Sequence, residues 1–94
     1  MKHNELIILE LNELGNKKAR LANELREWAF GQMMANTKAL WENDINEMAA
    51  DDRVAAAEAI QEECDSWLEI ALRIMDKADT AWNAAATYND NNQN

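Results

Sequence analysis

The chain contains no proline, only two glycines and a single cysteine among its 94 residues. Proline and glycine are the residues that most readily interrupt helices, so their scarcity favours long, uninterrupted helices. Valine occurs once, and no segment alternates apolar and polar residues as a half-buried strand would. The lone Cys64 excludes an intrachain disulfide and fits a buried thiol in a reducing compartment. These absences predict an all-α cytoplasmic protein.

Residues that commonly carry catalysis are also scarce. Ser66 is the only serine and His3 the only histidine, and no histidine shares a helical face with Ser66 or Cys64. No glycine-rich loop is present to cradle a phosphate, and the longest apolar run near the N-terminus, Leu6–Leu9, is too short for a signal segment or a membrane span. We therefore expect no enzymatic activity, no metal and no cofactor.

Positive charge is in short supply as well. Nine Lys/Arg stand against 18 Asp/Glu, which gives a formal net charge of −9. Residues 1–26 are nearly neutral. The segment from Glu42 to Glu69, by contrast, contains ten carboxylates and a single cation, Arg53. The electrostatic field of this excess negative charge repels nucleic acid and anionic membranes and attracts basic surfaces. The charge pattern predicts a basic protein as the partner, with no direct binding of nucleic acid or membrane.

The apolar pattern predicts a short first helix over residues 5–14, because Gly15-Asn16 is a typical C-terminal stop signal. A second helical segment covers residues 17–49. It either bends near Gly31 or forms one long helix, because its apolar residues change sides there. Before that point they lie in one narrow arc (Leu14, Leu21, Leu25 and Trp28), and after it they lie opposite (Phe30, Met34, Trp41, Ile45 and Met48).

The last predicted helix covers residues 53–87, with Asp51-Asp52 as its N-cap and first-turn acids. At 1.5 Å per residue it would be ~52 Å long, whereas a compact globule of this size is only ~32 Å across. The sequence therefore predicts an elongated helical hairpin or bundle of two long helices plus a short N-terminal helix. Residues 1–88 form its single domain, and residues 89–94 form a disordered polar tail.

Small residues recur every seven positions along this last helix, at Ala57, Cys64, Ala71, Ala78 and Ala85. Larger apolar residues flank them on both sides: Ile60, Trp67 and Ile74 on one, Leu68, Met75 and Trp82 on the other. A heptad of small residues lets a second helix approach closely. This small-residue seam either packs inside one chain or joins two chains in a homodimer.

Carboxylates line the opposite side of the same helix within about 60° of arc. The members of this carboxylate row are Glu58, Glu62, Asp65, Glu69 and Asp76. They are spaced at about one charge per 5 Å, and a DNA strand carries one charge per ~3.4 Å of axis. The row therefore suits a protein surface that is built to bind phosphates. The alternative interpretation is an ordinary solvated acidic face.

Trp41 differs from the other three tryptophans, which follow the core stripes. It shares a face with Met34, Ile45 and Met48, and it is surrounded by three acids: Glu42, Asp44 and Glu47. An aromatic with methionine neighbours and an acidic rim suits an interface hot spot for a basic partner. The alternative is that this face completes the core.

Two acidic pairs, Glu24-x-x-Glu27 and Glu62-x-x-Asp65, resemble the paired motifs of all-α nucleoside triphosphate pyrophosphohydrolases. That resemblance implies a Mg²⁺-dependent hydrolase, although the two pairs are more widely separated than in that family.

The composition favours a different function. It is similar to that of small acidic, phage-encoded inhibitors of host defence or replication proteins, which implies a DNA-mimic-like inhibitor of a basic, nucleic-acid-handling protein. A structural, oligomerising helical adaptor is the first alternative to that function, and the pyrophosphohydrolase is the second.

Overall fold

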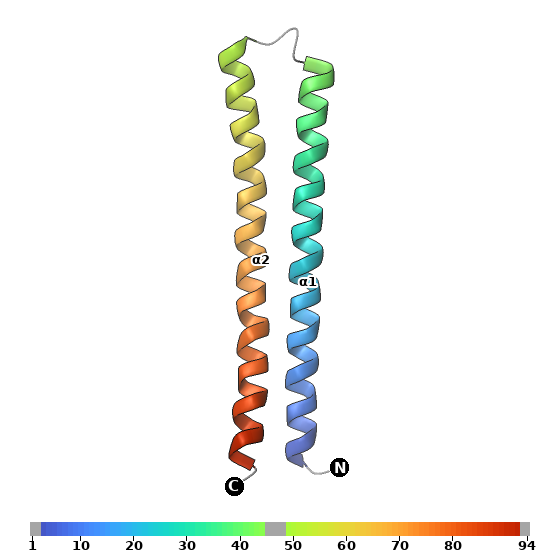
Figure 1. The fold of residues 1–94 in the computed structure, drawn as a ribbon, viewed down its shortest axis with the longest axis vertical. Helices are drawn as coiled ribbons and strands as arrows, with labels where there is room; N and C mark the ends of the chain where they lie inside the picture. The colour runs from blue at the N-terminus through green and yellow to red at the C-terminus, as the bar shows by residue number, and fades with distance from the viewer. Residues whose placement is uncertain (1–2, 45–48, 93–94) are drawn as a thin grey trace. The chain divides into compact units, whose positions relative to one another are not determined.

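The computed structural model describes residues 3–44 and 49–92 (Figure 1). Helix α1 spans His3–Ala39 and helix α2 spans Ala50–Asn92. A π-helical turn, Leu40–Asp44, follows α1. The described residues contain no strand, and α1 and α2 pair as an antiparallel hairpin, so the predicted all-α hairpin is confirmed.

Packing divides the chain into two units. Unit 1 comprises residues 1–23 and 71–94, and unit 2 comprises residues 24–70. Each unit therefore contains a segment of α1 packed against a segment of α2, and unit 2 also contains the connection between them.

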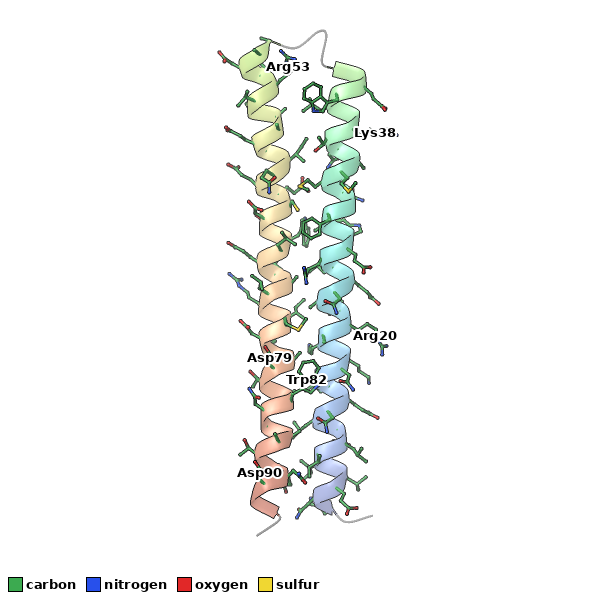
Figure 2. All side chains as sticks on the ribbon, in the orientation of Figure 1. Arg20, Lys38, Arg53, Asp79, Trp82 and Asp90 are labelled. Atoms are coloured by element: carbon green, nitrogen blue, oxygen red, sulfur yellow. The ribbon has the colours of Figure 1, made fainter. Side chains whose placement is uncertain are left out.

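In unit 1 the helices meet through small residues that the rest of the unit buries: Gly15, Ala22, Ala71, Ala78, Ala81 and Ala85. Trp82 points from α2 toward α1 (Figure 2), and its Nε1 donates a hydrogen bond to Asn16 Oδ1 at 3.2 Å. Tyr88 donates its hydroxyl to Asn4 Oδ1 at 3.2 Å. Because the interface residues are small, the helix backbones approach closely while the large aromatic side chains close the edges of the contact.

In unit 2 the buried interface residues are Ala29 and Cys64. Beside them the rings of Trp28 and Trp67 meet edge to face, with centroids 5.3 Å apart and planes at 89°. This is a favoured arrangement for aromatic pairs, because the positive ring edge meets the negative ring face. Ala57, the first member of the predicted seam, is exposed. The other four members are buried within one chain, which confirms the intramolecular interpretation of the seam.

The prediction that Gly15-Asn16 ends a short N-terminal helix is wrong, because α1 passes through both residues. No glycine in the described residues has a positive φ, so Gly15 does not adopt the left-handed conformation that ends helices. It serves close packing instead. A Cβ built on Gly15 would lie 2.9 Å from Cε2 of Trp82 and closer still to Nε1 and Cδ1 of the same ring.

The other helix boundaries also differ from the prediction. α1 runs through Gly31 without interruption, which agrees with the alternative of one long helix, but it ends at Ala39 rather than near residue 49. Because α2 begins at Ala50, Asp51 and Asp52 lie in its first turn, where the positive end of the helix dipole stabilises them, rather than at the N-cap. α2 continues through Asn92 rather than ending at residue 87, so residues 89–92 of the predicted polar tail are helical, and residues 93–94 lie outside the described residues.

Candidate protein-binding surface

Four members of the carboxylate row lie in unit 2, namely Glu58, Glu62, Asp65 and Glu69, and all four are exposed. At 100° per residue they lie about 100° to 160° around α2 from the buried Cys64, so they face away from the α1 contact. Asp76, the fifth predicted member, is also exposed but belongs to unit 1. The structure therefore brings four of the five acids together on one unit.

The four carboxylates of this row form no ion pair among the described residues. Asp65 accepts a hydrogen bond from Gln61 Nε2 at 3.0 Å, and this neutral donor leaves its charge in place. Ser66 donates to the backbone carbonyl of Glu62 at 3.0 Å, which does not involve the carboxylate. The negative charge of the row is therefore available to an outside cation.

Unit 2 as a whole is strongly acidic, because its sequence contains twelve carboxylates and three Lys/Arg. Unit 1 contains six of each and is formally neutral. The whole formal charge of −9 thus belongs to unit 2.

Trp41 lies beside a groove of about 280 Å³ that runs between the start of α2 and the π-helical turn. The groove is lined by Leu40, Trp41, Ala50, Arg53, Val54 and Ala57. Trp41 is 60% exposed and Val54 is 57% exposed, so large apolar surfaces are open to a partner. The interpretation of Trp41 as a core residue is wrong, because more than half of its surface is exposed.

The acidic rim predicted for Trp41 is described only in part. Glu42 is exposed and pairs with Lys38 Nζ at 3.9 Å, within the same helical segment. The side chain of Asp44, together with Ile45, Glu47 and Met48, lies outside the described residues. Met34 is 68% exposed but does not line the groove.

The residues that α2 contributes to this groove carry no signal in the sequence. Val54 and Arg53 follow the connection between the helices, and no local spacing links them to Trp41. Arg53 Nε is buried with no hydrogen-bond partner among the described residues. Buried donors are normally satisfied. Arg53, one of the residues that line the groove, therefore holds a buried donor that no described residue satisfies.

The geometry does not assemble the acidic pairs that resemble a pyrophosphohydrolase. All four carboxylates, Glu24, Glu27, Glu62 and Asp65, are exposed. Within residues 3–44 and 49–92, no three acidic, histidine or cysteine side chains converge on a point where they could hold a metal ion. A Mg²⁺ site needs carboxylates that converge, so the resemblance is not supported by the structure.

Neither described helix has an apolar stretch sufficient to cross a lipid bilayer. Comparison with protein-family models, with curated proteins and with solved structures finds no match for this chain.

Proposed function

We propose that this protein is a non-catalytic, cytoplasmic binding module whose acidic unit 2 docks on a basic, nucleic-acid-handling protein and inhibits it by occupying its phosphate site. The observation that carries the proposal is the row of four unpaired carboxylates, Glu58, Glu62, Asp65 and Glu69, on the outer side of α2. Over 11 residues the row extends ~16 Å, with about one charge per 5 Å. Its charge spacing is of the same order as that of a DNA strand.

The row carries an energetic cost that solubility alone does not explain. Like charges four residues apart on a helix repel, by roughly 0.2–0.5 kcal/mol per pair. Glu58 with Glu62 and Asp65 with Glu69 are such pairs, and no lysine or arginine is placed between them. A basic partner would relieve this repulsion on binding, which favours a role in recognition.

Trp41 and its groove supply the second part of the proposed surface. Charged contacts at the rim of an interface chiefly raise the association rate, whereas desolvated aromatic anchors supply most of the affinity. Trp41 and Val54 would receive an apolar side chain of the partner, and the carboxylates of unit 2 would steer the partner's cations.

The experiment compares three baits in a quantitative pull-down from the native cell at low and high salt. The first bait is the unchanged chain. The second replaces the four row carboxylates with their amides (E58Q, E62Q, D65N and E69Q). The third is a control that removes the same number of charges from unit 1, where the chosen acids are also exposed and lie outside the carboxylate row (E10Q, E13Q, D79N and D90N).

We expect the unchanged and control baits to retain the same basic nucleic-acid-binding protein, which salt or competing DNA releases. The row variant should lose at least about tenfold in affinity for it, which corresponds to ~1.4 kcal/mol. Equal capture by all three baits would overturn the proposal.

A structural, oligomerising adaptor remains the alternative function, and the half-exposed leucines of α1 favour it. In that case neutralising the row would leave partner binding intact, because the acidic face would serve solubility only.

A further inference from the structure

Among the residues whose side chains the structure describes, no large side chain is completely buried. Its buried residues, besides Gly15, are alanines and Cys64, while leucines of α1 are nearly half exposed, such as Leu14 at 46% and Leu21 at 48%. The small-residue seam is already occupied by the other helix of the same chain. Any self-association must therefore use a different surface.

Two hydrogen bonds that cross between the helices of unit 1 identify its two sides. Asn4 and Tyr88 meet on one side, and Asn16 and Trp82 meet on the other. Measured from Gly15 at 100° per residue, Leu14 lies about 100° toward the side of the Asn4–Tyr88 contact.

The Asn4–Tyr88 side of unit 1 is apolar on both helices, and we call it the leucine face. α1 contributes Ile7, Leu11, Leu14, Lys18 and Leu21, and α2 contributes Ile74, Lys77, Ala81, Ala84 and Tyr88. Of these ten residues only Ala81 is buried. Large aliphatic side chains in contiguous array on a surface are typical of a protein–protein interface.

Acidic residues are few on the leucine face. Glu10 lies at its outer edge, about 20° around α1 from Leu21, and the other described carboxylates of unit 1 lie elsewhere around the two helices: Glu5, Glu13, Asp76, Asp79 and Asp90. The two lysines of the face, Lys18 and Lys77, can extend their charged ends to solvent over the apolar surface. Since unit 1 is formally neutral, two such faces can meet without the repulsion that two copies of unit 2 would experience.

The area of the face is sufficient for a specific contact. The α1 segment 3–23 is ~31 Å long, and two adjacent helices present a width of ~20 Å, so the face covers about 600 Å². Two such faces bury about 1,200 Å² in total, which reaches the range of specific interfaces.

We propose that a second copy of this chain docks on the leucine face of unit 1, so that the two hairpins form a four-helix arrangement through this unit. Leu14 and Leu21 are its central contacts. The occupant is a second copy because the face is apolar and the unit neutral, whereas a basic partner would be drawn to unit 2.

Sedimentation equilibrium of the full chain tests the proposal. The unchanged chain should have twice the monomer mass of 10.7 kDa. The variant L14E/L21E should raise the dissociation constant of the dimer by at least about 100-fold, because leucine burial is lost and charge is introduced. Leu9→Glu is the matched control, because Leu9 is 48% exposed on the other side of the same helix segment and should leave the dimer intact.

A second measurement does not depend on the folding of the charged variants. In a Cys64→Ala background, a cysteine at position 21 should react with a thiol reagent at least about tenfold more slowly at high protein concentration than at low concentration. A cysteine at position 9 should react at one rate at both concentrations. A monomeric chain, or equal protection at both positions, would overturn the proposal. Neither result depends on the carboxylate row, so the proposed function is tested separately.

Discussion

The two glycines of this chain should respond to the same substitution with opposite signs. Both lie inside α1, where alanine is preferred over glycine by roughly 0.5–1 kcal/mol because glycine loses more backbone entropy on folding. At Gly31 nothing lies within 4 Å of an added Cβ, so the helix preference acts alone. Gly31→Ala should therefore stabilise the protein by roughly 0.5–1 kcal/mol.

At Gly15 the helix preference competes with steric overlap. The added Cβ would lie within 2.9 Å of Cε2 of Trp82 and nearer to two other ring atoms, so the indole must move. Overpacking of this kind costs typically about 1–3 kcal/mol, and displacement of the ring also breaks its hydrogen bond to Asn16, worth about 0.5–1.5 kcal/mol. After the helix gain of roughly 0.5–1 kcal/mol is subtracted, we expect Gly15→Ala to destabilise the protein by about 0.5–4 kcal/mol.

Urea denaturation followed by circular dichroism at 222 nm measures both variants. A double-mutant cycle isolates the cause, because Gly15→Ala in a Trp82→Ala background should become neutral or stabilising. If Gly15→Ala and Gly31→Ala stabilised the protein equally, the close approach of Trp82 to α1 would be refuted.

Three further perturbations test the packing of the hairpin. Ala71→Glu should lower the free energy of unfolding in urea by more than about 3 kcal/mol, because it places a charge at a position that is 1% exposed. Leu72→Glu is the control: this position is 63% exposed, so the free energy of unfolding should change by less than about 0.5 kcal/mol. Cys64 should react with a thiol reagent at least about 100-fold more slowly in buffer than in denaturing urea, because only opening of the helix pair exposes it; equal rates would contradict its burial. Tyr88→Phe should cost about 0.5–1.5 kcal/mol in thermal unfolding, and that loss should vanish when Asn4 is already alanine.

The carboxylate row illustrates how far the candidate site could be predicted. Its four members in unit 2 were found from spacing alone, because positions on one helix face follow directly from the 100° repeat. The groove beside Trp41 was not found, since Val54 and Arg53 reach it from the next helix across the connection. Periodicity within one helix carries no information about which turns of another helix it meets.

The sequence by itself determined the helical class, because residues that break helices are nearly absent. It also determined the small-residue seam, because a strict seven-residue repeat relates Cys64, Ala71, Ala78 and Ala85. Only the tertiary structure decided the role of Gly15, which resembles a helix stop locally but makes room for an indole 67 residues later in the chain. The tertiary structure also decided where α2 ends, since Tyr88 donates a hydrogen bond to Asn4, which lies 84 positions earlier in the chain. Local backbone preference acts over a few residues, whereas these features depend on contacts between distant segments that form only when the helices pair.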